Sequence, residues 1–139
     1  MKKRVFFIIL MLTIMLPMVA QEVIHLTTEQ FKEKIFDYTT EKDWKYKGDR
    51  PCVIDFYAIW CGPCKRLAPI MDTLSHLYKD QVVFYKVDTD KEPELVHVLQ
   101  IKSIPLVLYV PMEGDPRIAQ GYHELDYWQE AIKQILGVE

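Results

Sequence analysis

The sequence predicts an α/β protein with a mixed central sheet and helices on both faces of that sheet. Segments typical of strands alternate with segments typical of helices, as in parallel strands connected by helices. Residues 52–58, CVIDFYA, form a nearly continuous apolar run, which is typical of a strand buried on both faces. Two apolar segments near the end, joined by a turn around Gly114, add an antiparallel hairpin.

The elements are expected in the order β-α-β-α-β-α-β-β-α. Thr27 and Gln30 have the spacing of a capping box that opens the first helix. The polar residues 39–51 are expected to form a loop, and Pro69 to kink the second helix. The expected strands are residues 22–26, 52–58, 82–90, 104–110 and 117–122. The helices after the first are expected at residues 64–79, 92–100 and 124–137.

The first twenty residues have the layout of a secretory signal peptide. Basic residues at positions 2–4 precede an uncharged apolar run over residues 5–19, and Ala20 offers a small residue for cleavage. An uncleaved membrane anchor is the alternative. The apolar run is shorter than the roughly 20 residues of a membrane span and contains Pro17. We therefore expect a signal peptide over residues 1–20 and an exported, periplasmic or otherwise extracytoplasmic protein.

Without this leader, residues 21–139 make one mildly acidic domain. The full chain has a formal net charge of −3, and removal of three basic residues leaves −6. Such a domain has no electrostatic reason to bind nucleic acid or anionic lipid. A hydrophobic fraction of 50% can fill a core without a disulfide framework, and we expect a monomer.

Cys61 and Cys64 are separated only by Gly62 and Pro63, at the expected start of the second helix. The unpaired N–H groups and partial positive charge of a helix N-terminus stabilise a thiolate, which is the nucleophile of disulfide exchange. Cys64 lies one turn further, where it can attack a mixed disulfide and release the product. Pro63 suits the first turn because it needs no partner for an N–H. The pattern predicts a redox-active pair.

Three other roles for the pair are less well supported. A zinc site normally takes four ligands, and only Cys52 and four scattered histidines remain to complete one. A structural disulfide that closes so short a loop would constrain the unfolded chain little. A cysteine hydrolase needs a His partner oriented by Asp or Asn, which the spacing neither indicates nor excludes. Cys52 itself is expected to be a small buried hydrophobe.

Asp55 lies in the middle of the buried strand, six residues before Cys61. Burial of a carboxylate is costly and raises its pKa, so beneath the pair Asp55 can accept the proton of Cys64. The alternative is an edge-strand Asp that faces solvent. Pro105 opens a later apolar strand, where either a trans proline or a cis turn fits, and trans is the more frequent.

These residues resemble the thioredoxin family. Residues 55–69, DFYAIWCGPCKRLAP, are similar to the active-site segment of the family. Residues 85–90, YKVDTD, are similar to the strand that follows, and residues 103–110, SIPLVLYV, to the strand opened by the family's cis-proline. Gly121 resembles the glycine near the active-site rim, and the resemblance covers about residues 23–136.

The resemblance implies a thioredoxin fold and a thiol–disulfide oxidoreductase with no cofactor besides its own Cys61–Cys64 disulfide, and no metal. It implies that Cys61 is the exposed nucleophile and Cys64 the resolving cysteine. Asp55 becomes the buried base, assisted by Lys86.

The resemblance also implies how the site binds a substrate. Pro105 is expected to be cis and to form, with Ile104 and Trp60, the surface that grips the substrate backbone, with Gly121 at its rim. Gly62 and Pro63 are expected to tune the reduction potential.

The resemblance to the family also indicates the direction of electron flow. The Gly-Pro pair and Ile104 resemble the reducing type of the family, and the 41 positions from Cys64 to Pro105 leave no room for the helical insertion of strong oxidants. We expect a protein-disulfide reductase of the cell envelope that acts on exported client proteins with electrons from a membrane carrier. The alternatives are a disulfide oxidase or isomerase for exported proteins, and a thioredoxin-fold binding module.

Overall fold

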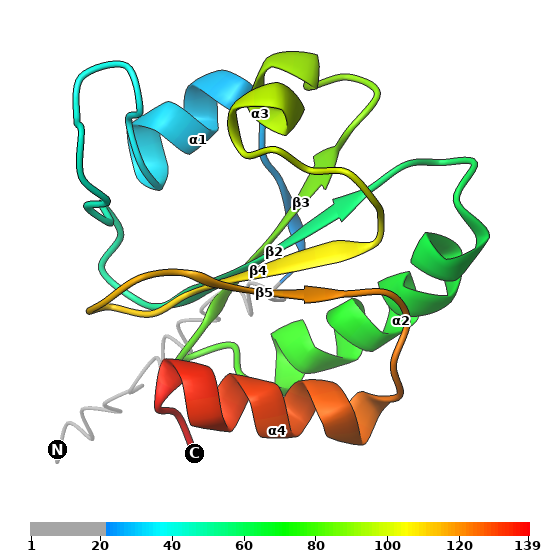
Figure 1. The fold of residues 1–139 in the computed structure, drawn as a ribbon. Helices are drawn as coiled ribbons and strands as arrows, with labels where there is room; N and C mark the ends of the chain where they lie inside the picture. The colour runs from blue at the N-terminus through cyan, green and yellow to red at the C-terminus, as the bar shows by residue number, and fades with distance from the viewer. Residues whose placement is uncertain (1–21) are drawn as a thin grey trace, which may run out of the picture.

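A five-stranded sheet separates two pairs of helices in the computed structural model, which describes residues 22–139 (Figure 1). The strands are β1 (Ile24–His25), β2 (Cys52–Tyr57), β3 (Val83–Asp88), β4 (Leu106–Val110) and β5 (Arg117–Gln120). The helices are α1 (Thr28–Lys34), α2 (Gly62–Leu77), α3 (Pro93–Val98) and α4 (Leu125–Leu136). The predicted order of elements and the α/β class are confirmed. The expected signal peptide, residues 1–20, lies outside the described residues.

The strands lie in the order β1-β3-β2-β4-β5, with β2 at the centre. β2 runs parallel to β3 and antiparallel to β4, and β4 pairs antiparallel with β5. The mixed sheet is confirmed, but its antiparallel part is larger than the terminal hairpin that the sequence predicts. The central position of β2 explains its apolar composition, because both of its edges and both of its faces are covered.

Each face of the sheet has its own apolar core. α2 and α4 cover one face, where Trp128 and Leu67 are fully buried together with Val53 of β2 (Figure 1). α1 and α3 cover the other face, where Phe31 and Leu95 pack with Ile54 and Phe56 of β2, among others. The alternation along β2 therefore directs Asp55 toward the side of α2.

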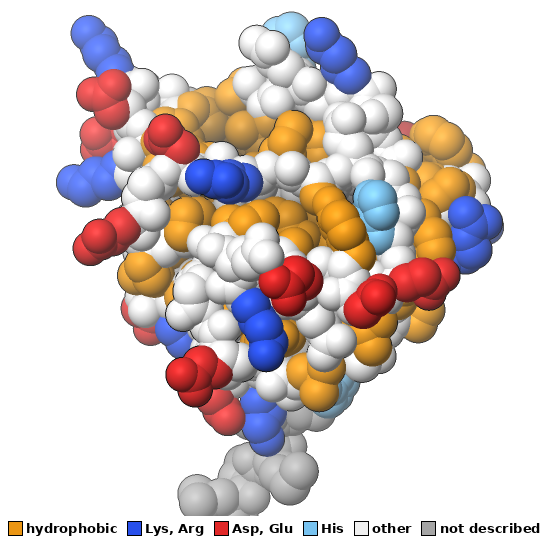
Figure 2. Space-filling view, turned by 60° about the horizontal axis from the view of Figure 1, so that its bottom comes forward, with side chains coloured by type: hydrophobic (Ala, Val, Ile, Leu, Met, Phe, Trp, Pro, Cys, Tyr) orange, Lys and Arg blue, Asp and Glu red, His pale blue; other side chains and the backbone are white. Residues whose placement is uncertain are grey.

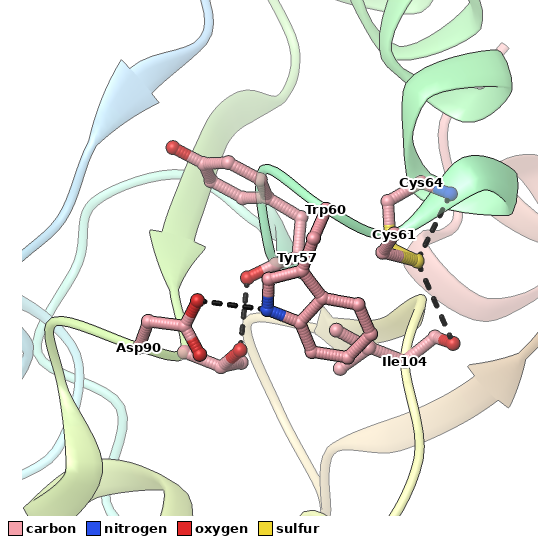
Figure 3. The surroundings of a disulfide bond; sticks show 7 residues. Tyr57, Trp60, Cys61, Cys64, Asp90 and Ile104 are labelled. Atoms are coloured by element: carbon pink, nitrogen blue, oxygen red, sulfur yellow. Dashed lines mark hydrogen bonds between the residues drawn. A yellow bond between two sulfur atoms is a disulfide. The ribbon is translucent and has the colours of Figure 1, made fainter.

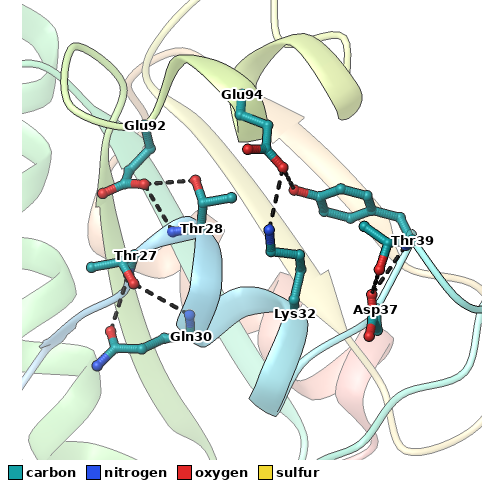
Figure 4. A network of polar contacts seen from close by, with 9 residues as sticks. Thr27, Thr28, Gln30, Lys32, Asp37, Thr39, Glu92 and Glu94 are labelled. Atoms are coloured by element: carbon teal, nitrogen blue, oxygen red, sulfur yellow. Dashed lines mark hydrogen bonds and ion pairs between the residues drawn. The ribbon is translucent and has the colours of Figure 1, made fainter.

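Polar contacts fasten α1 to the start of α3 (Figure 4). The backbone N–H of Thr28 and its hydroxyl both donate to Oε2 of Glu92, at 2.8 and 2.6 Å. Lys32 and Tyr38 converge on Oε1 of Glu94, at 3.4 and 2.7 Å. The capping box predicted for Thr27 is also present. The contacts to Glu92 and Glu94 join segments more than fifty positions apart and tie α1 to α3 on the face of the sheet opposite α2.

The polar segment after α1 folds back onto the same face. The indole of Trp44 lies 4.8 Å from the ring of Phe36, centroid to centroid, and the Tyr46 hydroxyl donates to the carbonyl of Arg50 at 2.6 Å. The predicted loop is confirmed, and its aromatic residues extend the apolar core. Among residues 22–139, no helix has both the length and the apolar character needed to cross a membrane.

Candidate active site

A disulfide joins Cys61 and Cys64 at the first turn of α2 (Figure 3). Their Cα atoms are 5.2 Å apart. Cys61 is the N-cap of the helix, and the backbone N–H of Cys64 points at Sγ of Cys61, with N and Sγ 3.3 Å apart. This N–H and the helix dipole stabilise negative charge on Cys61 once the disulfide is reduced. The helix begins two residues earlier than predicted because the pair itself forms its first turn.

Both cysteines are nearly covered. Cys61 is 5% exposed and Cys64 is 3% exposed, so the expectation of an exposed Cys61 is wrong for this disulfide form. Ala58 lies in one cluster with the pair, and Tyr57 and Ile104 pack against it. The carbonyl oxygen of Ile104 lies 4.0 Å from Sγ of Cys61. An incoming sulfur therefore has to fit between side chains that already surround its target.

Trp60 and Ile59 make the rim of the site apolar. The two side chains belong to residues that are 68% and 69% exposed. The indole N–H of Trp60 donates to Oδ2 of Asp90 at 2.9 Å, which fixes the ring beside the disulfide (Figure 3). The preceding residue, Thr89, donates from its N–H and its hydroxyl to the carbonyl of Tyr57, at 2.8 and 3.0 Å. The sequence alone indicates neither contact, although the carboxyl ends of the parallel strands β2 and β3 must meet at one edge.

Pro105 follows Ile104 in the chain and is hydrogen-bonded to Gly121. The Ile104–Pro105 peptide bond is cis, as the family resemblance implies and against the trans preference of proline in general. Gly121 has φ 82°, a left-handed conformation that glycine adopts without strain, and its N–H donates to the carbonyl of Pro105 at 2.9 Å. The structure thus places Trp60 and Ile104 at the disulfide, and it joins Gly121 to Pro105, the residue after Ile104.

Asp55 is a buried carboxyl behind the disulfide. Its residue is 5% exposed, and Oδ1 has no hydrogen-bond partner among the described residues. Burial raises the pKa of Asp55 to about 7, and the positive charge of Lys86 partly opposes that rise. Lys86 lies directly opposite Asp55 in the register of β2 and β3. Because this pKa lies near neutral pH, Asp55 can both accept and return a proton.

Asp55, Lys86 and Cys64 line one pocket of about 310 Å³ between the sheet and α2. The carboxyl and the resolving sulfur therefore share one space beneath the surface. Cys52 has no place in it: this thiol is completely buried on the other face of β2, where burial raises its pKa to about 12. The expectation of a small buried hydrophobe at Cys52 is confirmed. Residues 22–139 contain no group of three or more His, Cys, Asp or Glu side chains that could hold a metal ion.

Comparison with known proteins assigns the family. The family model described as Thioredoxin matches residues 22–134. The chain belongs to the thioredoxin family. It is 46% identical to the thioredoxin of Borreliella burgdorferi over 114 residues, which are 82% of this chain and 97% of that protein.

Solved structures of thioredoxins have the same fold. Chloroplastic thioredoxin z has a TM-score of 0.70 and 25% identity, with 82% of this chain and 94% of the other covered. The thioredoxin of Malassezia sympodialis has a TM-score of 0.66 and 29% identity, with 82% and 90% covered. The protein is therefore a thioredoxin-family thiol–disulfide oxidoreductase, whose redox centre is its own cysteine pair.

The raised pKa of Asp55 makes the stability of the fold depend on pH. An ordinary Asp has a pKa of 3.8, so the folded protein binds this proton more tightly than the unfolded chain does. That stabilisation is complete below about pH 4 and is lost as the pH rises to about 7, at a cost of roughly 4 kcal/mol over three pKa units. Urea unfolding of the oxidised protein is expected to show this decline, and Asp55→Asn is expected to abolish it.

Asp72→Asn is the matched control, because Asp72 lines the same pocket but is exposed. This variant should keep the decline in the free energy of unfolding between pH 4 and pH 7. An identical pH dependence in Asp55→Asn and the unaltered protein would show that Asp55 is not the buried titrating group.

Proposed function

We propose that this protein is a disulfide reductase of the cell envelope that transfers two electrons from the Cys61–Cys64 dithiol to disulfides of exported proteins. The observation that carries the direction is the buried carboxyl of Asp55, whose Oδ1 has no hydrogen-bond partner within residues 22–139 and which lines the same pocket as Cys64. Strong oxidants of this type owe their high potential to a stabilised reduced form. A buried carboxylate next to the pair disfavours thiolate in the reduced form, which favours the disulfide and makes the dithiol a stronger reductant.

The reaction takes two displacement steps. The Cys61 thiolate attacks one sulfur of the client disulfide, so that a Cys61–client disulfide forms and the second client sulfur leaves as thiolate. Asp55 then takes the proton of Cys64, and the Cys64 sulfur attacks Sγ of Cys61. The remaining client sulfur leaves, and two electrons have moved to the client.

The apolar rim supports a protein as the substrate. Trp60 and Ile59 expose large apolar side chains beside the nearly covered disulfide, and apolar patches of this kind bind other proteins. On the face shown in Figure 2, acidic and basic side chains are interspersed around apolar ones. This mixture supports neutral protein surfaces, rather than nucleic acid, as partners. The cis Ile104–Pro105 bond and the hydrogen bond from Gly121 to Pro105 agree with the expected substrate-binding residues, which are Trp60, Ile104, Pro105 and Gly121.

The layout of the N-terminal residues supports the cell envelope as the location. A basic start, an apolar run over residues 5–19 and Ala20 together resemble an export signal. An exported reductase is separated from cytoplasmic electron donors, so a membrane carrier would have to reduce Cys61–Cys64 again after each turnover.

The reduction potential of the Cys61–Cys64 pair tests the direction of electron flow. Equilibration of the purified protein in defined redox buffers is expected to give a value near −270 mV, the thioredoxin end of a range whose oxidising end is near −120 mV. Cys61→Ser and Cys64→Ser should abolish client reduction. A potential near −120 mV would favour the disulfide oxidase instead, and full function in the Cys variants would favour a binding module.

Cell fractionation tests the proposed location. We expect the protein in the envelope fraction, with a mature N-terminus that begins after residue 20 because the small Ala20 ends the export signal. Replacement of Lys2, Lys3 and Arg4 by Glu should leave the uncleaved protein in the cytoplasm. If the protein with the unaltered sequence stayed uncleaved in the cytoplasm, the proposal would be contradicted. If it stayed uncleaved in the envelope, residues 1–20 would be an anchor.

A further inference from the structure

Three titratable side chains from neighbouring strands lie in one row across the sheet. His25 of β1 is in register with Lys86 of β3, and Lys86 is in register with Asp55 of β2. Residues in register on parallel strands direct their side chains to the same face. All three line the pocket of about 310 Å³ that also contains Cys64. The row therefore runs from the centre of the sheet to its edge.

The two ends of the row differ in their access to water. Asp55 is buried, whereas His25 is exposed on β1, an edge strand of only two residues. Strands lie about 4.8 Å apart, so the backbones of His25 and Asp55 are about 10 Å apart. A pocket of about 310 Å³ is wide enough for several waters, each of which takes about 30 Å³. The pocket therefore has room for water between the two side chains.

The surroundings of His25 keep its imidazole uncharged near neutral pH. Partial burial, Lys86 and Lys91 lower the pKa of His25 below its usual 6.5, while Asp88 and Glu22 oppose that change. The ring of Tyr57 lies 6.4 Å away, centroid to centroid. The imidazole is thus largely uncharged at pH 7, so it can take up a proton transiently and release it to water. Lys86 lies between His25 and Asp55 in the row. Its ammonium group has only hydrogen-bond donors, so it cannot accept the proton itself.

We propose that His25 relays protons between the buried Asp55 and solvent, an inference that rests on the proposed exchange reaction. The proton that Asp55 takes from Cys64 passes across the pocket to the imidazole of His25 and then to bulk water. When a donor reduces the disulfide again, a proton returns along the same row. No electrons move in this step, and each group ends in its starting state.

Proton exchange at Asp55 tests the relay directly. In oxidised protein with ¹³C-labelled aspartate, the line shape of the Asp55 carboxyl carbon through its titration reports the exchange rate. His25→Gln is expected to slow that exchange about tenfold. This factor is smaller than the roughly 10²-fold to 10⁴-fold rate effect that is typical of a positioned acid or base. The pKa of Asp55 should change little, since the lost imidazole is largely uncharged at pH 7. Added imidazole, which is small enough to enter the pocket, should restore the rate.

His97→Gln is the matched control, because His97 lies on α3 at the other side of the sheet and does not line this pocket. In the His97→Gln variant, the rate of proton exchange at Asp55 should equal that of the unaltered protein. An unchanged rate in His25→Gln, or a slowed rate that imidazole does not restore, would overturn the relay. The carboxyl signal does not depend on the direction of electron flow. A potential near the oxidising end would therefore overturn the proposed function and leave the relay standing.

Discussion

The structure depends on one unfavourable placement, a carboxyl group in the middle of the central strand. Asp55 pairs through its backbone with β3 on one side and β4 on the other, so its side chain can only enter the space beneath α2. The neighbours of Asp55 along β2, from Cys52 to Phe56, are all buried and apolar, and their packing holds the strand in place. The carboxyl of Asp55 is thereby removed from water, which is unfavourable. The same desolvation raises the pKa of Asp55 to near neutral pH, where a proton acceptor is most effective.

The two sulfurs lie in opposite electrostatic surroundings. Cys61 caps α2, where backbone N–H groups favour a thiolate, and Cys64 lies one turn deeper, beside the Asp55 carboxyl. The first sulfur is thus prepared to attack, and the second keeps its proton until Asp55 removes it. The asymmetry follows from where α2 begins, because Cys61 is its N-cap and Cys64, in its first turn, lines the same pocket as Asp55.

Features that depend on a local sequence pattern were predictable. The apolar run of β2, the capping box at Thr27 and the helix start at the cysteine pair each lie within a few residues, and all three form. The cis Pro105 came only from the family resemblance, since local preference favours trans.

Contacts set by strand register were not predictable. The hydrogen bond from Trp60 to Asp90 and the row from His25 to Asp55 both join segments about thirty positions apart. Their partners are decided by which residues of β1, β3 and β2 lie side by side, and a slip of one residue would move each side chain to the other face. The nearly complete cover over Cys61 has a similar origin, because Ile104 reaches it from a distant loop.

The release step tests the central claim, that Asp55 removes the proton from Cys64. A client joined to Cys61 in a mixed disulfide can be followed as Cys64 displaces it, from about pH 5 to about pH 9. If Asp55 is the acceptor, the rate should rise with a midpoint near 7, where this carboxyl ionises. Asp55→Asn should remove that midpoint and slow release at pH 7 by roughly 10²-fold. The same rate and the same pH profile in both proteins would contradict the account.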